Sequence, residues 1–381
     1  MDVKTEKKRG LAAIFALCPV RHVIALVSAG LILLHLVTRQ NYRLMAKLSK
    51  NLVRPLHQFM AKSLDALPFS VAELLICAAA AITLVYIIIQ IIRIVTCKDK
   101  LKKVYITLIS LMSAVLAVYA LFSMLWGIFF YGDDFMTASG LENGKISTEQ
   151  LETVTAYFAA LTNEYADKVQ RNENGFYIAD RAELLEKSPE VFLGLEKSFP
   201  CLEGAEVHVK GIRLSRALSY LDFTGFFFPF TAEANVNMDF PPSLFASTVA
   251  HELCHQRGVA KEQEANFVAV LASLDYGDAD YCYSACLLAY TYLGNALYRA
   301  DYEAWEKVYM SLDENVHRDF ALNRAYWQQF ETPVQTVSNT VYEGLLQSYD
   351  QELGLKSYGA CVDLLVNYYY ETAAEYMEKA A

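Results

Sequence analysis

The chain has 381 residues, of which 54% are hydrophobic, and its mean hydropathy is +0.20. This apolar content is high for a soluble protein and indicates membrane-spanning segments. Residues 1–130 hold 16 Lys and Arg against 5 Asp and Glu, whereas residues 131–381 hold 17 against 38, so the net charges of +11 and −21 sum to −10. The acidic part argues against nucleic acid as a partner, because phosphate backbones bind basic surfaces.

Residues 1–131 are predicted to form a transmembrane region with three spanning helices, at about residues 23–37, 71–95 and 104–131. A basic tail, Lys4–Arg9, precedes them. The apolar run after this tail is short and a longer one follows, so we expect an anchor and not a cleaved signal peptide. Trp126 and Tyr131 suit a membrane interface at the end of the third span.

The basic residues of the loops predict how these spans are oriented. The N-terminal tail and the short loop Lys98–Lys103 are basic and are expected to be cytoplasmic. Three spans then place the acidic part outside the cytoplasm. The segment Arg39–Lys62 is also basic and would face outward, which disagrees with this rule. Its apolar residues recur at roughly helical spacing, so it could lie along the membrane surface.

Residues 132–381 have the composition of a second, soluble domain. Its sequence predicts, in chain order, a helix from the capping box at Ser147 to Val169, a helix at Arg181–Lys197, a strand at Glu206–Leu214, one or two strands within Phe223–Met238, a helix from Pro241 to Gly258, a helix at Ala260–Leu274, and helices from Tyr281 onward. The eight Cys show no disulfide framework or zinc-ribbon spacing, and buried free thiols are the simpler interpretation.

The most informative stretch is the helix that contains His251-Glu252-Leu253-Cys254-His255. Two His four residues apart lie on one face of a helix, so both rings can reach one zinc ion at about 2.0–2.1 Å. Glu252 is placed to act as a general base toward a water at that ion. The uncharged flanking residues fit a buried helix.

A third ligand is expected from the next helix, after the turn at Gly258. Glu262 would complete a set of two His and one Glu and leave one coordination position open. Glu264 is the rival ligand. It lies about 200° around the helix from Glu262, so the two carboxylates cannot both point at one ion.

The pair of motifs, His251-Glu252-x-x-His255 and Glu262-x-x-Ala265-Asn266, resembles the gluzincin metallopeptidases. The resemblance covers about 30 residues. It implies that Glu262 is the third zinc ligand and that Asn266 stands beside it, where related membrane peptidases often carry Asp. The fold class expected on this basis is mainly α, with a three-helix transmembrane region followed by a zincin-like α+β domain that has a short sheet and many helices.

A second resemblance covers most of the chain and is to an uncharacterised bacterial family of membrane-anchored, zinc-peptidase-like proteins of unknown function. It is carried by the three N-terminal spans and by short segments along the chain: Pro68-Phe69-Ser70, Trp126-Gly127, Ser219-Tyr220, Pro229–Asn237, Lys356-Ser357-Tyr358-Gly359 and Val362-Asp363-Leu364-Leu365.

The predicted function is hydrolysis of peptide bonds in a peptide or protein substrate, with Zn²⁺ held by His251, His255 and Glu262 and with Glu252 as general base. The segment Phe226–Asn237 could bind the substrate as an added strand. The residue that stabilises the oxyanion stays open among four candidates, namely His317, Arg318, Tyr220 and Tyr358. The alternatives are a non-catalytic zinc-containing binding or signalling module at the membrane and a membrane scaffold or transporter. A transport path is disfavoured because the spans lack paired charges.

Overall fold

The computed structural model describes residues 10, 12–141, 144–349 and 359–380. The basic tail Lys4–Arg9 and the segment Lys356–Tyr358, both noted in the sequence, lie outside the described residues. The chain divides into two compact units. Unit 1 consists of Met1–Leu48 and Val71–Gly132, and unit 2 consists of Ser49–Ser70 and Asp133–Ala381.

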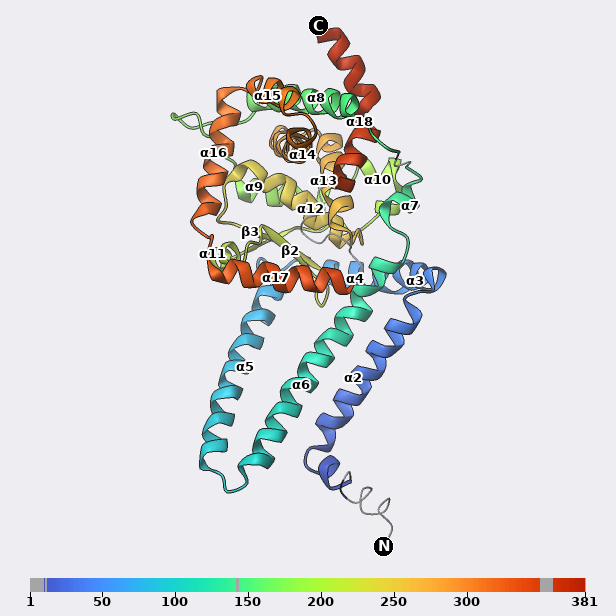
Figure 1. Ribbon diagram of the computed structural model, residues 1–381, viewed down its shortest axis with the longest axis vertical. Helices are drawn as coiled ribbons and strands as arrows, with labels where there is room; N and C mark the ends of the chain where they lie inside the picture. Colours follow the sequence, from blue (N-terminus) through green and yellow to red (C-terminus); the bar gives the residue numbers. More distant parts are fainter. Residues whose placement is uncertain (1–9, 11, 142–143, 350–358, 381) are drawn as a thin grey trace. The chain divides into compact units, whose positions relative to one another are not determined.

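Unit 1 contains three helices that are long and apolar enough to cross a membrane, as the sequence predicted: α2 (Pro19–Thr38), α5 (Val71–Thr96) and α6 (Lys100–Leu125). Within this unit α6 packs against both α2 and α5 (Figure 1). A short helix, α3 (Tyr42–Leu48), follows α2.

The third candidate span begins and ends earlier than the predicted range 104–131. It ends at Leu125 and not at Tyr131, because Gly127–Tyr131 forms a separate 3₁₀ turn, η2. Glycine is a poor helix former, and in the turn the ring of Trp126 packs against those of Phe129 and Phe130, with centroids 5.4 and 6.1 Å apart.

The segment between the first two spans belongs to unit 2, although the sequence grouped it with the membrane region. It forms a π-helical turn, η1 (Ser49–Val53), and α4 (Arg54–Asp65). Ala61 of α4 packs with Ala205, Val207 and Ala232, and Arg54 donates to the Cys201 carbonyl at 2.7 Å. The two pieces of unit 2 are separated by two candidate spans, and an even number of crossings returns a chain to the same side of a membrane.

Unit 2 is mostly helical and surrounds one large hydrophobic core. The capping box at Ser147 is present at the start of the predicted helix. Besides η1, α4 and the helices of the candidate site, the described residues of this unit form α7 (Phe135–Ser139), α8 (Thr148–Ala166), α9 (Arg181–Lys187), α10 (Leu195–Ser198), α11 (Ser215–Tyr220), α14 (Ala279–Ala300), α15 (Tyr302–Met310), α16 (Glu314–Gln328) and α18 (Gly359–Ala380), with the 3₁₀ turns η3 (Ser188–Glu190) and η4 (Pro200–Leu202).

The prediction of one helix over Arg181–Lys197 is wrong, because this segment forms α9, η3 and α10 instead. Pro189 lies in η3, where it cannot donate the backbone hydrogen bond that a continuing helix requires. The strand predicted over Glu206–Leu214 is reduced to β1 (Lys210–Ile212). The preceding backbone bonds to side chains instead: the His208 N–H donates to Asp65 at 2.7 Å and the Val209 N–H to Ser188 at 3.0 Å.

The sheet of unit 2 has three strands in the order β1-β3-β2. Two strands within Phe223–Met238 were among the predicted possibilities, and they form β2 (Gly225–Phe228) and β3 (Glu233–Asn237). β3 pairs in parallel with β1 and antiparallel with β2. β2 is therefore an edge strand, and none of the described strands pairs with its outer side. All eight Cys are free thiols, and Cys254 is fully buried.

Candidate metal centre

The motif His251-Glu252-x-x-His255 lies on α12 (Phe245–Gln256), which packs against β2 and β3. The helix is preceded by a 3₁₀ turn, η5 (Pro242–Leu244), because proline is well suited to the first turn of a helix. It ends before Gly258, whose positive φ of 87° is accessible to glycine at little cost. Every residue of α12 except His251 is buried, so the surroundings of the motif are held rigidly by the core.

Glu262 is brought to the two His by the turn at Gly258 and by the next helix, α13 (Glu262–Tyr276). One donor atom from each of His251, His255 and Glu262 lies within 4.8 Å of the other two. The Glu262 carboxylate oxygens are 3.2 Å from His251 Nε2 and 3.6 Å from His255 Nε2. Two donors about 2.0–2.2 Å from one tetrahedral ion lie roughly 3.3–3.6 Å apart. The donor set and its spacing therefore fit Zn²⁺.

The hydrogen bonding of His255 supports the same reading. Its Nδ1 lies 2.7 Å from the Val259 carbonyl oxygen. A carbonyl can only accept, so Nδ1 carries the proton and Nε2 faces Glu262. A zinc-binding His commonly has this arrangement, in which one ring nitrogen donates to a backbone carbonyl and the other coordinates the metal. The tight turn after α12 thus supplies a contact that fixes the orientation of the ring.

The carboxylate and the imidazoles stabilise one another as charges. Burial alone would raise the pKa of Glu262, but His255 and His251 beside it lower that pKa well below its usual range. Burial alone would lower the pKa of His255, and the neighbouring Glu262 instead raises it to about 9. A Zn²⁺ ion at this position would take the place of the proton as the positive partner of Glu262.

Glu252 lies deeper in the fold, with only 3% of its surface exposed. Burial raises the pKa of its carboxyl group to about 7. Its Oε2 has no hydrogen-bond partner among the described residues. The carboxylate fits against β2 only because residue 225 is glycine: a Cβ there would lie 2.6 Å from Glu252 Oε1. Sequence reasoning did not identify Gly225 as part of the site.

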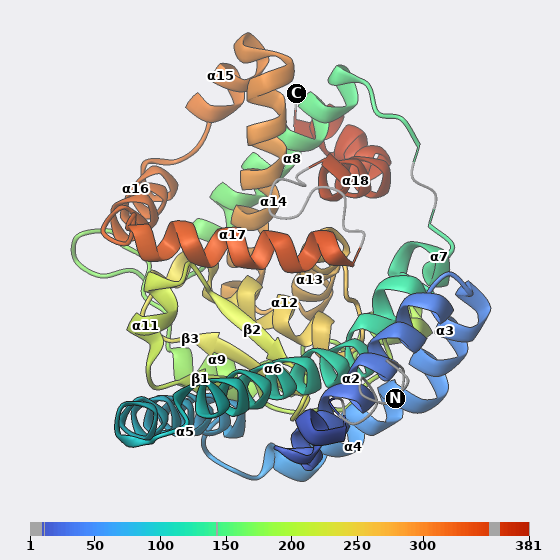
Figure 2. The same ribbon diagram turned by 60° about the horizontal axis from the view of Figure 1, so that its bottom comes forward.

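Tyr342 is a second residue that sequence reasoning missed. It lies on α17 (Pro333–Ser348), which runs across the face of unit 2 that carries β2 (Figure 2). The Tyr342 hydroxyl donates to Glu262 Oε1 at 2.7 Å. No spacing signal distinguishes it among the 25 Tyr of the chain, because 80 residues separate it from its partner.

The rival ligand Glu264 does not join the three-residue group. It is buried away from it and accepts a hydrogen bond from the Phe135 backbone N–H at 2.8 Å. Asn266, expected beside the third ligand, is half-buried, and its side chain has no hydrogen bond among the described residues.

Three of the four candidates for stabilising an oxyanion make contacts with residues outside the three-residue group. Tyr220 packs edge-on against Phe330, with ring centroids 4.9 Å apart. His317 packs on Tyr309 at 4.6 Å, and Arg318 forms an ion pair with Glu314. Tyr358 lies outside the described residues.

Comparison with known protein families finds a match, which covers most of the chain and includes the candidate metal centre. The model of a family of proteins of unknown function (DUF3810) matches residues 48–366. The chain therefore belongs to this family, as the second resemblance indicated for a family of unknown function. The description of the family names no activity. No curated protein and no solved structure matches the chain.

Proposed function

We propose that the chain is a membrane-anchored, zinc-dependent metallopeptidase of the gluzincin type, in which unit 2 hydrolyses peptide bonds. The observation that carries this proposal is the convergence of His251, His255 and Glu262 at zinc-ligand spacing, with Glu252 on the same helix. A site that only holds structure would normally be closed by a fourth protein ligand. The described residues offer three such ligands.

Each residue of the chain has a distinct part in this reaction. His251, His255 and Glu262 would hold Zn²⁺, which, when bound, activates water and polarises a carbonyl group. Glu252 would accept a proton from the attacking water at its unpartnered Oε2 and pass it to the leaving amine. Gly225 lets Glu252 approach the site, and Tyr342 orients the Glu262 carboxylate by its hydrogen bond.

The substrate would bind as an additional strand at β2. This strand is one edge of the sheet, and it begins at Gly225, where a Cβ would lie 2.6 Å from Glu252 Oε1. An extended peptide that pairs with an edge strand gains regular backbone hydrogen bonds and presents its backbone carbonyls in register. A peptide on this edge would therefore pass close to the candidate metal centre.

The site is proposed to face outward from the cytoplasm. Unit 2 is acidic, whereas the loop between α5 and α6 is basic and is expected to stay in the cytoplasm. The segment Ser49–Ser70 is basic, but it follows the first span and would face outward if the N-terminal tail is cytoplasmic. It packs with Asp133–Ala381 in unit 2, which supports placing both segments on the same side of the membrane.

The test compares the full chain, purified in detergent micelles, with two variants. Wild type is expected to contain about one zinc and to cleave peptides from a mixed library. The Glu252→Gln variant should keep its zinc and lose cleavage, because it lacks only the proton acceptor. The His255→Ala variant should lose both. Wild type that binds no zinc would refute the proposal. Wild type that binds zinc and cleaves nothing would favour the non-catalytic binding or signalling module.

A further inference from the structure

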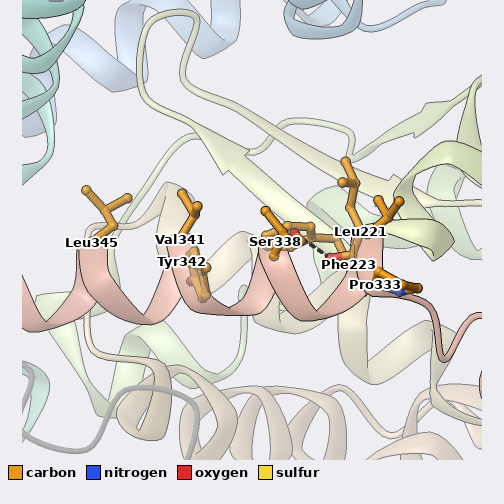
Figure 3. A pocket seen from close by; sticks show the side chains of 9 residues that line it. Leu221, Phe223, Pro333, Ser338, Val341, Tyr342 and Leu345 are labelled. Carbon is orange, nitrogen blue, oxygen red and sulfur yellow. Dashed lines mark hydrogen bonds between the residues drawn. The ribbon is translucent and has the colours of Figure 1, made fainter.

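An apolar groove lies beside the candidate metal centre, between α17 and the segment that leads into β2 (Figure 3). Its volume is about 590 Å³, within the roughly 300–1,000 Å³ typical of ligand-binding pockets. One wall consists of Leu221 and Phe223. The other is a stripe on α17, formed by Val334, Val337 and Val341, which recur at the helical spacing of one face.

The groove is continuous with the residues proposed to act on the substrate. Tyr342 lines it and at the same time donates to Glu262. The ring of Phe223 meets that of Tyr342 edge-on, with centroids 5.3 Å apart. Two residues further along the chain, Gly225 lies so close to Glu252 that a Cβ there would be 2.6 Å from its Oε1. The start of β2 therefore joins the groove to both Glu252 and Glu262.

The groove offers a polar ligand little to bind. The Ser338 hydroxyl already donates to the Leu221 carbonyl at 2.9 Å, and the Tyr342 hydroxyl already donates to Glu262. The stripe, in contrast, is poorly covered: Val334, Val337 and Val341 are 53%, 63% and 68% exposed. Covering exposed apolar surface is favourable in proportion to its area, so the occupant that fits this groove is apolar.

We propose that this groove receives an apolar side chain, such as Leu or Phe, of a peptide that lies along β2. The inference rests on the proposed peptidase function and adds its substrate class: peptides with a large apolar residue near the cleaved bond. A bilayer surface could cover the exposed stripe, but it is broad and would not fill a groove that is also lined by Phe223 and Tyr342. The geometry therefore favours a side chain over lipid.

Binding is measured first, because it does not depend on turnover. The full chain with Glu252→Gln, in lipid nanodiscs and loaded with zinc, is titrated with fluorescent peptides that differ at one position, Leu or Phe against Ser or Asn. We expect the apolar peptides to bind at least about tenfold more tightly. A double substitution, Val337→Thr with Val341→Thr, keeps the β-branched shape and adds two hydroxyl groups. It should reduce the preference about tenfold.

Met310→Gln serves as the matched control, because Met310 is 73% exposed at the end of α15 and does not line the groove. This variant should keep the full preference. With Glu252 intact, the same peptides should show the same preference in kcat/KM, and the double variant should lose it there too.

Three results separate the possibilities. If wild type cleaves peptides without preference, or if the double variant keeps the preference, the groove proposal is refuted and the peptidase proposal stands. If nothing is cleaved but apolar peptides still bind through the groove, the peptidase proposal fails and the groove remains a peptide site. If brominated lipids quench an added Val341→Trp fluorophore and the double variant leaves peptide binding unchanged, the stripe faces the bilayer and the proposal is overturned.

Discussion

Gly225→Ala provides a direct test of how the candidate site is packed. A Cβ at this position would lie 2.6 Å from Glu252 Oε1, 2.8 Å from Glu252 Cγ and 2.8 Å from the Asn235 carbonyl oxygen. Ordinary contact begins near 3.4 Å, so these neighbours must move apart by about 0.6–0.8 Å. The Asn235 backbone is held in β3, between β1 and β2. The Glu252 side chain is therefore the neighbour that is displaced most, and the remaining contact with the Asn235 carbonyl strains the pairing of β2 with β3.

Two effects are expected from this substitution. Overpacking of a buried contact costs about 1–3 kcal/mol of unfolding free energy. Displacing a general base by nearly 1 Å lowers kcat on the order of 100-fold. Zinc content should not change, because the three atoms nearest to a Cβ at residue 225 belong to Glu252 and Asn235 and not to a ligand. Thermal unfolding, metal analysis and peptide cleavage of the full chain measure the three quantities.

Gly344→Ala on α17 is the matched control, because a Cβ there meets nothing within 4 Å. It should stabilise the helix by about 0.8–1.0 kcal/mol and leave cleavage unchanged. If Gly225→Ala is as stable as wild type to within about 0.5 kcal/mol and equally active, the close approach of β2 to Glu252 is not as described.

Three further predictions concern single side chains. Tyr342→Phe should lower zinc affinity about 10–100-fold through loss of its hydrogen bond to Glu262, measured by competition with a chelator; unchanged affinity would show that the bond does not orient the ligand. Glu262→Gln should lose zinc whereas Glu264→Gln should keep it, and the reverse result would exchange their roles. Burial lowers the pKa of His57 from 6.5 to about 4. The unfolded chain therefore binds a proton at a higher pH than the folded protein does. The unfolding free energy keeps its full value above pH 6.5 and falls by about 3 kcal/mol as the pH decreases toward 4. His57→Leu should flatten this part of the curve of unfolding temperature against pH, and an unaltered curve would exclude His57 as its source.

The parts of the site that were predictable from the sequence are those set by local geometry. The spacing of His251 and His255 requires only that the segment be helical, and one turn of chain brings Glu262 back to them. Gly225 and Tyr342 were not predictable in this way, because their partners lie 27 and 80 residues away and no periodicity links them. Glu264 illustrates the same limit, since its partner, the Phe135 N–H, lies 129 residues away.

The fold shows the same division between local and distant contacts. The three candidate spans were predictable because a helix long enough to cross a membrane needs about 20 consecutive apolar residues, which the sequence shows directly. The strand expected over Glu206–Leu214 failed because side chains of distant segments, Asp65 and Ser188, accept hydrogen bonds that a neighbouring strand would otherwise take. Alternating apolar residues predict a buried face, but they do not determine which group accepts each backbone hydrogen bond.

The division of unit 2 into two pieces imposes an order on its biosynthesis. The ribosome makes Ser49–Ser70 before the second and third candidate spans, yet this segment packs with residues made more than 100 positions later. Lys210, for example, donates to the carbonyl oxygens of Asp65 and Leu67, at 2.6 and 2.8 Å. α4 is therefore made before its packing partners, and the two candidate spans α5 and α6 are made between them. A shortened chain that begins at residue 133 would lack this piece, which makes it a poor choice for producing a soluble fragment.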